Sequence, residues 1–391
     1  MGILIEKSER LKKLPPYLFA EIDKAKRKAI QDGKDIIDLG VGDPDTPTFP
    51  HIVQEMGKAI QEPKNHRYAL DAGILELRET IARWYKERFN VELDPGTEIL
   101  PLIGSKEGIA HIPLAFVNPG DVVLVPDPCY PPYKSGTIFA GGEPYIMPLL
   151  EKNGFLPDLR EIEPVIARKA KLIFLNYPNN PTSAVADRKF FEDVVDFAFS
   201  NNIIVCHDAA YSEISYDGYR AMSFLEVEGA KEVGIEFHSL SKTFNMTGWR
   251  IGFACGNRQV IEALASVKSN IDSGIFQAIQ YAGIAALNNS SGELLKRLSS
   301  MYQERRDILV DGLNSLGWKV TKPRATFYVW LSVPPGSSST SLSKFLLEKA
   351  NIIVTPGTGF GENGEGYIRM ALTVSKDRIR EAIGRLKGLK I

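Results

Sequence analysis

The fold is decided by one stretch of the sequence, Glu236-Phe-His-Ser-Leu-Ser-Lys242-Thr-Phe-Asn-Met-Thr-Gly-Trp-Arg250-Ile-Gly-Phe-Ala-Cys255. It begins as an apolar strand, turns at its serines, presents Lys242, and places Arg250 eight residues later. Lysine is almost never fully buried without a partner, so a lysine among small and apolar neighbours indicates either a structural ion pair or chemistry. For Lys242 alone, a structural ion pair is the favoured interpretation. Its role has to be inferred from the other residues of the sequence.

Length and composition are those of an ordinary globular protein. The chain has 391 residues, of which 44% are hydrophobic and 24% charged, and this length favours two domains. The 47 Lys and Arg residues balance 48 Asp and Glu residues, which gives no electrostatic reason to expect nucleic acid or an anionic membrane as a partner. We therefore expect a ligand that is recognised at a local site.

Targeting signals and metal motifs are not found in the sequence. No apolar run approaches the ~20 residues of a transmembrane helix, and the charged N-terminal stretch does not fit a signal peptide. The three cysteines, Cys129, Cys206 and Cys255, are far apart and form no CxxC or Cys/His zinc pattern. The sequence therefore predicts a cytoplasmic protein without a structural metal.

From about residue 98, apolar strands alternate with helical segments. Continuous apolar strands joined by helices indicate a mainly parallel sheet covered on both faces. Ligands of such sheets bind beyond the carboxyl ends of the strands. The expected strands are Ile99–Ile103, Val122–Val125, Leu172–Leu175, Ile203–Cys206, Ile235–Ser239 and Ile251–Ala254, and the helices include 106–117, 158–168 and 187–201.

The remaining segments indicate a second, smaller α+β unit. Expected elements of its C-terminal part are a helix through 302–316, strands near 318–320 and 326–331, a serine-rich turn at 337–341 and a final helix after Ser375. We predict an N-terminal arm and part of the small domain over 1–48, a large domain over 49–287, and the rest of the small domain over 288–391.

The polar residues that follow the strands point to one kind of site. Each alone has a structural explanation, with Asp208 as a helix cap, Asn180 as a turn former and Tyr130 as packing. Together they offer an amine, a carboxylate, hydrogen-bond donors, an aromatic ring and a helix start that can bind phosphate, which is what pyridoxal 5′-phosphate needs. The candidates are Ser105, Lys106, Tyr130, Asn180, Asp208, Tyr211, Ser239, Lys242 and Arg250.

In these residues the chain resembles the fold-type I, class I/II pyridoxal-phosphate aminotransferases over essentially its full length. The resemblance rests on Ser239-x-x-Lys242, the Lys242-to-Arg250 spacing, Asn179-Asn180-Pro-Thr and Asp208-x-x-Tyr211. Through Leu14-Pro-Pro-Tyr17-Leu-Phe-Ala-Glu21 the chain is similar to the LL-diaminopimelate aminotransferase branch. The family implies a large domain with a mainly parallel seven-stranded sheet between helices, and a smaller α+β domain.

The resemblance also implies roles for the cofactor-binding residues. Lys242 would hold the cofactor covalently and carry the proton, and Asp208 would bind the pyridine nitrogen. Tyr211 and Asn180 would reach the ring hydroxyl, and Tyr130 would lie against the ring face. The phosphate would be held by Ser105, Lys106, Ser239 and Arg250, and by Tyr68 of a partner subunit, and Ser241 would also bind the cofactor.

Substrate binding follows from the same resemblance. Arg369 would bind the substrate α-carboxylate in a bidentate fork, with Gly42 close by. Tyr17 and Lys106 would bind the far end of the substrate. The substrate would also touch Tyr130 and Asn180.

The expected function is transfer of an amino group between LL-2,6-diaminopimelate and 2-oxoglutarate, giving tetrahydrodipicolinate and glutamate, in lysine biosynthesis. The expected assembly is a homodimer with the site at the subunit interface. One alternative is an aminotransferase for alanine, aspartate or an aromatic amino acid. Another is a pyridoxal-phosphate carbon–sulfur lyase, which needs the same Lys242 and Arg369. A non-enzymatic regulator would be expected to carry an appended nucleic-acid-binding domain, and the sequence has none.

Two further features sit beside these residues. Gly359-Phe-Gly361-Glu-Asn-Gly364 fits the dinucleotide pattern GxGxxG but leads into an apolar strand instead of a helix. We therefore interpret it as a hairpin loop that positions Arg369. His207 and His238 adjoin candidate residues at strand ends, and we expect them to pack or to hydrogen-bond rather than to catalyse.

Overall fold

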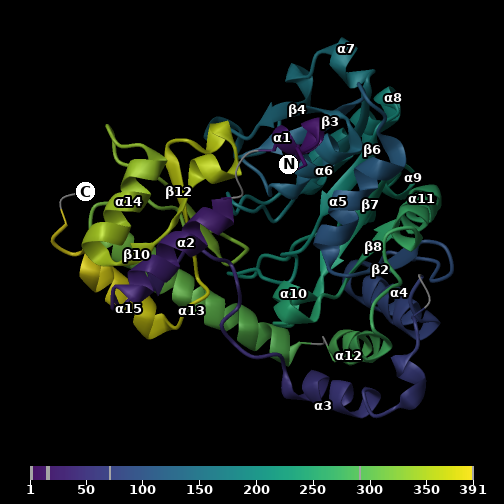
Figure 1. The fold of residues 1–391 in the computed structure, drawn as a ribbon, viewed down its shortest axis with the longest axis horizontal. Coiled ribbons are helices and arrows are strands. Elements are labelled where there is room, and N and C mark those ends of the chain that lie inside the picture. The colour runs from purple at the N-terminus through teal and green to yellow at the C-terminus, as the bar shows by residue number, and fades with distance from the viewer. Residues whose placement is uncertain (1–2, 15–17, 70–71, 290–291, 390–391) are drawn as a thin grey trace.

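A seven-stranded sheet forms the centre of the larger part of the molecule (Figure 1). The computed structural model describes residues 3–14, 18–69, 72–289 and 292–389. The sheet has the order β2-β8-β7-β6-β5-β3-β4. Its strands are β2 (Ile99–Leu102), β3 (Val122–Asp127), β4 (Glu143–Pro148), β5 (Ala170–Asn176), β6 (Ile204–Asp208), β7 (Gly234–Ser239) and β8 (Gly252–Gly256).

The pairing of this sheet confirms the predicted fold class. Strands β3 to β7 pair in parallel, whereas β8 runs antiparallel to both β2 and β7. Successive side chains of a strand point to opposite faces. Along β3, Val122 and Leu124 join one buried apolar cluster while Val123 and Val125 join another. Both faces are therefore covered, which explains why the strands are apolar without alternation.

Helices cover the two faces and connect the strands. The parallel strands need such crossovers, because a short turn can join only antiparallel neighbours. The α-helices of this part are α4 (Leu75–Phe89), α5 (Ser105–Phe116), α6 (Pro132–Ala140), α7 (Pro164–Ala167), α8 (Arg188–Asn201), α9 (Ala230–Val233), α10 (Leu240–Thr243), α11 (Arg258–Ser269) and α12 (Gln277–Asn288). Helix α3 (Pro50–Ala59) packs against α12.

The C-terminal elements gather on the other side of the molecule (Figure 1). They form a three-stranded sheet of order β11-β12-β9 and a separate pair, β1-β10, with its own buried apolar cluster. The strands are β1 (Ile37–Asp38), β9 (Tyr328–Ser332), β10 (Ile352–Ile353), β11 (Thr355–Pro356) and β12 (Tyr367–Ala371). The helices there are α13 (Glu293–Ser315), α14 (Ser339–Ala350) and α15 (Lys376–Leu386).

Part of the N-terminal segment belongs to this smaller side as well. Strand β1 lies parallel to β10, with Ile37 opposite Ile352. Two helices precede it, α1 (Glu9–Lys12), which packs against α6 of the larger part, and α2 (Leu18–Gln31). The 3₁₀ segments are η1 (Pro63–His66), η2 (Glu151–Asn153), η3 (Leu159–Glu161), η4 (Phe224–Glu226), η5 (Thr247–Trp249), η6 (Gly357–Phe360) and η7 (Glu362–Gly364).

Three local expectations were wrong. The helix expected at 158–168 is two short pieces, η3 and α7, because Pro164 cannot continue a helix but can begin one. No strand forms at 318–320, because the side-chain amide of Asn314 binds both the N–H and the C=O of Val320. The serine-rich turn at 337–341 is the start of α14, where Ser338 and Ser341 form a capping box.

Membrane-spanning helices and metal clusters are not found among the described residues. None of the helices within the described ranges is both long enough and apolar enough to cross a bilayer. In the same residues, no group of three or more His, Cys, Asp and Glu side chains is arranged to hold a metal ion.

Candidate active site

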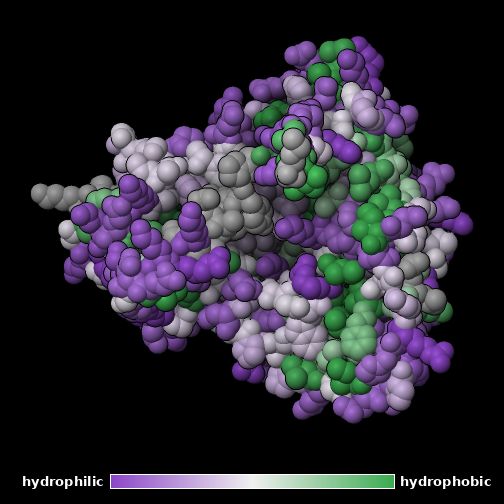
Figure 2. Space-filling model, viewed as in Figure 1, coloured by the Kyte–Doolittle hydropathy of each residue, from purple (hydrophilic) through white to green (hydrophobic). Residues whose placement is uncertain are grey.

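A cavity of about 460 Å³ lies where the carboxyl ends of β5, β6 and β7 face the smaller sheet. Figure 2 shows the molecule hollowed between the C-terminal elements and the part built on the large sheet. The cavity is lined by Val41, Gly42, Ser105, Lys106, Tyr130, Asn176, Asn180, Asp208, Ala210, Tyr211, Ser239, Ser241, Lys242, Thr247, Arg250, Tyr328 and Arg369.

All but two of the candidate residues therefore meet in one place. Tyr17 lies outside the described residues. Tyr68 is described, but its side chain is 86% exposed and does not line the cavity. The candidates that follow strands of the large sheet meet because parallel strands end at one edge. Gly42 and Arg369 come from the smaller side, after β1 and on β12.

Lys242 lies in the single-turn helix α10, directly after β7. Its Nζ donates to the backbone carbonyl of Gly42 at 2.8 Å, so the partner is a neutral oxygen rather than a carboxylate. Burial lowers the pKa of Lys242 to about 8, with Arg369 and Arg250 acting in the same direction and Asp43 opposing them. A substantial fraction of the amine is therefore neutral at mildly alkaline pH, which a nucleophile or base requires.

Asp208 ends β6 and is 4% exposed. Burial raises the pKa of this carboxyl, and hydrogen bonds to its oxygens act in the opposite direction. Tyr133 donates its hydroxyl to Oδ2 at 2.8 Å, and the Ala210 N–H lies 3.3 Å from Oδ1. Tyr133 comes from α6, where its ring stacks on Phe174 with 5.0 Å between centroids. The carboxylate is thus held in a fixed orientation at the cavity wall.

Two asparagines connect this carboxylate region to the arginine. Asn176, the last residue of β5, donates to the carbonyl oxygen of Asp208 at 2.7 Å and accepts from the Asn180 N–H at 2.7 Å. The side-chain oxygen of Asn180 in turn accepts from Arg369 Nη1 at 2.7 Å. Asn180 therefore lies between the expected cofactor site and the expected carboxylate site.

Arg369 is held in a closely defined slot on β12. The residue is 1% exposed, and Nη2 donates to the carbonyl oxygen of Gly40 at 2.7 Å. Its guanidinium carbon lies 4.1 Å from the ring centroid of Tyr328 and 4.6 Å from that of Phe360, within range of cation–π attraction. Burial lowers the pKa of Arg369 from its ordinary value, and an arginine keeps its charge at neutral pH.

The opposite end of the cavity fits an anion. Ser105 and Lys106 form the first turn of α5, where backbone N–H groups are available to a ligand. A Cβ built on Gly104 would lie 2.3 Å from Arg250 Nη2, so only glycine lets the arginine approach. The Ser241 hydroxyl is buried and has no hydrogen-bond partner within the described ranges. These groups fit the phosphate of pyridoxal phosphate.

Sequence reasoning missed three of the residues around this cavity. Tyr133 follows Tyr130 by three residues, and this repeat of tyrosine at a helix start was the signal for it. Asn176 ends a strand in the same way as Asp208. Tyr328, whose hydroxyl lies 3.1 Å from that of Tyr211, comes from the smaller sheet and carried no local signal.

The flanking features behave as expected. Strands β11 and β12 pair antiparallel, with Thr355 opposite Arg369, so the glycine-rich segment is a hairpin loop. His207 Nδ1 lies 2.8 Å from Glu236 Oε2, and His238 Nε2 lies 2.7 Å from Glu236 Oε1. Neither histidine lines the cavity, so both hydrogen-bond within the core.

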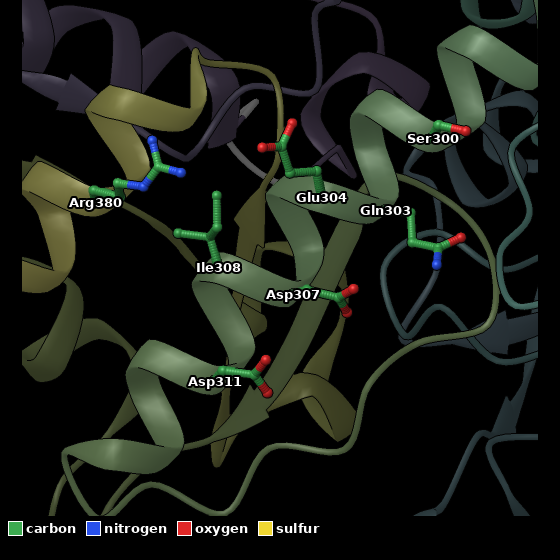
Figure 3. A pocket seen from close by; sticks show the side chains of 7 residues that line it. All are labelled: Ser300, Gln303, Glu304, Asp307, Ile308, Asp311 and Arg380. Atoms are coloured by element: carbon green, nitrogen blue, oxygen red, sulfur yellow. The ribbon is translucent and has the colours of Figure 1, made fainter.

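A second hollow, of about 480 Å³, lies elsewhere on the surface of α13 (Figure 3). It is lined by Ser300, Gln303, Glu304, Asp307, Ile308, Asp311 and Arg380. Lys322 contacts both Asp307 and Asp311, at 3.2 and 2.9 Å, so these acids are engaged in ion pairs. None of the candidate residues lies there, and the cavity around Lys242 is the candidate active site.

Known proteins resemble this chain in sequence. A protein of Moorella thermoacetica named LL-diaminopimelate aminotransferase is 60% identical over 383 residues, covering 98% of both chains. One of the same name from Aquifex aeolicus is 53% identical over 388 residues, covering 99% of this chain and all of the relative.

Solved structures resemble it as well. Substrate-bound BacF from Bacillus subtilis superposes with a TM-score of 0.95 at 42% identity, covering 100% of this chain and 99% of the other. A mutant aspartate aminotransferase of Thermus thermophilus gives a TM-score of 0.91 at 30% identity, covering 98% and 99%. The sequence profile of the aminotransferases of class I and II matches residues 34–386. The chain belongs to this family of pyridoxal-phosphate-dependent enzymes.

Proposed function

We propose that this aminotransferase interconverts LL-2,6-diaminopimelate plus 2-oxoglutarate and tetrahydrodipicolinate plus L-glutamate, in lysine biosynthesis. The name of the relatives at 53–60% identity over nearly the whole chain supports the substrate. The observation that carries the chemistry is the meeting of Lys242, Asp208 and Arg369 in one cavity. These residues supply a base, a partner for a pyridine nitrogen and a receptor for a carboxylate.

The cofactor would be held at both of its ends. Ser105, Lys106, Ser239, Ser241 and Arg250 would bind its phosphate. When bound, pyridoxal phosphate supplies the carbonyl that takes up the amino group and the ring that withdraws electrons from the substrate.

Four residues would contact the rest of the cofactor. Lys242 would attach it covalently, and Tyr130 would lie against the ring face. Tyr211 and Asn180 would reach the ring hydroxyl. All four side chains line the cavity, and Tyr211 is buried with its hydroxyl 3.1 Å from that of Tyr328.

Asp208 would keep a proton on the pyridine nitrogen. This role needs an ionised carboxylate in a buried place, which burial alone disfavours. The hydroxyl of Tyr133, 2.8 Å from Oδ2, stabilises the ionised form. Asp208, kept ionised by Tyr133, would therefore accept the hydrogen bond of the ring N–H.

Lys242 would serve as the base that takes the proton from the substrate Cα. A pKa of about 8 leaves Nζ partly neutral near neutral pH and strong enough to accept a proton. As pH falls below 8 the amine becomes protonated, so proton abstraction should slow toward acid. Placement of this single base decides which carbon receives the proton afterwards.

The substrate would be held by its carboxylates. Arg369 would bind the α-carboxylate, because its fork is fixed by Asn180 and by the Gly40 carbonyl and lies between two aromatic rings. Gly42 would lie close to it. Tyr17 and Lys106 would bind the distal end of diaminopimelate, and this assignment rests on the family resemblance.

We also propose a cytoplasmic homodimer in which Tyr68 reaches the phosphate of the partner's site. Tyr68 is 86% exposed and does not line its own cavity, which supports a role in trans. Figure 2 shows apolar side chains over the face where α3 and α12 lie, and Val53 and Ile60 are exposed there. The division into 1–48, 49–287 and 288–391 is likewise part of the proposal.

The substrate is tested by following the absorbance of the bound cofactor. Adding LL-diaminopimelate to the purified protein should change the spectrum, and adding 2-oxoglutarate should reverse the change. Alanine, aspartate and an aromatic amino acid serve as comparison donors. Conversion by one of these, without conversion by diaminopimelate, would contradict the proposed substrate. Lys242→Ala should bind the cofactor without a covalent bond and should show no turnover.

A further inference from the structure

Asp127 is a buried carboxylate to which the proposed mechanism gives no role. It ends β3, three residues before Tyr130, and is 5% exposed. Its Oδ1 accepts a hydrogen bond from the backbone N–H of Asn363 at 2.8 Å. This hydrogen bond therefore joins the end of β3 in the large sheet to the glycine-rich loop of the β11–β12 hairpin.

The loop is shaped to receive this carboxylate. Gly361 has φ +137°, and a Cβ built there would lie 2.1 Å from Asp127 Oδ2. A side chain at position 361 is thus excluded both by the backbone conformation and by the carboxylate. A second bond runs alongside the first, because the Cys129 N–H donates to the Phe360 carbonyl at 2.8 Å.

The same loop builds one wall of the Arg369 slot. The Phe360 ring centroid lies 4.6 Å from the Arg369 guanidinium carbon, and Trp330 packs edge-on against Phe360 at 6.1 Å between centroids. The backbone that precedes Tyr130 is therefore tied to the residue that flanks Arg369. Any shift of the loop relative to β3 would move Phe360 against the guanidinium.

We propose that Asp127 is a positioning residue, which fixes Phe360 and through it the orientation of Arg369 relative to Tyr130. The inference rests on the proposed role of Arg369 in binding a substrate carboxylate, and it holds for any amino acid substrate. The GxGxxG pattern at 359–364 is thereby explained as the receptor for this carboxylate.

Asp127→Ala removes the acceptor, and Asp127→Asn keeps an oxygen that can accept from Asn363. Burial raises the pKa of Asp127, so a neutral amide of the same shape is a tolerable substitute. We expect Asp127→Ala to raise KM for donor and acceptor about tenfold, the effect of one lost hydrogen bond. Its kcat should stay within about threefold of wild type. Asp127→Asn should restore KM.

Gly361→Ala perturbs the same contact from the loop side. It should reproduce the KM effect, and the double variant with Asp127→Ala should add little, because both break one interaction. Gly336→Ala is the matched control: Gly336 also has positive φ, +85°, but nothing lies within 4 Å of its Cβ position. This control variant should cost stability and leave KM unchanged.

Cofactor affinity separates positioning from general disruption. It is measured by titrating the cofactor-free variants with pyridoxal phosphate, and the dissociation constants should match wild type. Kinetics use whichever donor the wild type accepts best, so inactivity with diaminopimelate would remove the proposed substrate and leave this test intact. The inference is overturned by an unchanged KM in Asp127→Ala, by no rescue in Asp127→Asn, or by an equal loss of cofactor affinity.

Discussion

Among the groups that favour the ionised form of Asp208, one hydroxyl has the largest effect. Tyr133 donates to Oδ2 at 2.8 Å inside a site where burial raises the pKa of the carboxyl. Removing the hydroxyl in Tyr133→Phe should raise that pKa further, because the charged form loses a donor. The ionised carboxylate would then be lost at a higher pH. We expect kcat/KM at pH 7 to fall about tenfold and the acidic limb of its pH profile to move toward neutral.

Tyr177→Phe provides the matched control for this change. Tyr177 is equally buried, and its hydroxyl donates to a backbone carbonyl, that of Phe155, at 2.9 Å. It does not line the cavity. This variant should lose stability without any shift of the pH profile. An acidic limb that stays in place in Tyr133→Phe would show that other groups keep Asp208 ionised.

The site residues that could be predicted are those that the sequence places at or just after the end of a strand. Lys242 and Asp208 follow apolar strands directly, so the parallel sheet alone brings them to one edge. Tyr133 and Tyr328 reach the site from a helix and from the smaller sheet. Their contacts depend on how those elements pack, which no local sequence pattern contains.

At the scale of elements, the pairing of β6 with β7 creates a buried polar network. The register places His207 opposite Glu236, and His238 lies on the same face two residues further. Glu236 accepts from both imidazoles and also from the hydroxyls of Tyr85 and Ser223, at 2.7–2.9 Å. The carboxylate is fully buried, so its charge depends on these donors.

Glu236→Gln tests how far this network stabilises the two strands. Burial alone would raise the pKa of Glu236, but the hydrogen bonds from His207 and His238 outweigh it and hold the pKa below 4.5. A lowered carboxyl pKa stabilises the fold above the unfolded value and loses this effect as pH falls through the folded value. We expect Glu236→Gln to cost about 2–3 kcal/mol at neutral pH, with a difference that shrinks below pH 4.5.

Urea unfolding across pH measures the effect, and Glu304→Gln is its control. Glu304 pairs with Lys376 at 2.9 Å on the surface, where an ion pair contributes little. The control should therefore remain close to wild type at every pH. If Glu236→Gln behaves in the same way, the network does not stabilise the sheet.

Sequence reasoning missed one strand and wrongly expected another, and each error has a local cause. Strand β4, Glu143–Pro148, carries two prolines and lies at the edge of the sheet, so it lacks the apolar run of a central strand. At 318–320, the side chain of Asn314 binds the backbone N–H and C=O of Val320, which in a sheet would pair with a neighbouring strand. An edge position weakens the pattern in the first case and a side-chain contact replaces strand pairing in the second, whereas the central strands are buried on both faces and keep the apolar pattern.

At the scale of the whole molecule, the cavity is closed by segments from both ends of the chain. Gly40 and Gly42 follow β1 and offer their carbonyls to Arg369 and Lys242, respectively. Arg305 of α13 holds the same segment through Asp45, with two contacts of 2.7 and 3.0 Å. The large sheet thus supplies Lys242, the proposed base, and the smaller side supplies Arg369, the proposed carboxylate receptor, and the carbonyls that accept from both.

A mixed dimer tests whether the site is completed by a second copy of the chain. Tyr68→Ala and Lys242→Ala each impair a homodimer, the first by removing the proposed phosphate contact and the second by removing the base. If Tyr68 acts in the partner's site, a dimer of the two variants has one site with both residues intact and one site with neither. Purified mixed dimers, carrying two different tags, should therefore regain about half of the wild-type activity.

If Tyr68 instead acts within its own subunit, the one site that keeps Lys242 lacks Tyr68. The mixed dimer should then have at most half the activity of a Tyr68→Ala homodimer. The mixed dimer contains the same residues under either hypothesis. Its activity therefore shows whether the exposed Tyr68 acts in the partner's site or in the site of its own subunit.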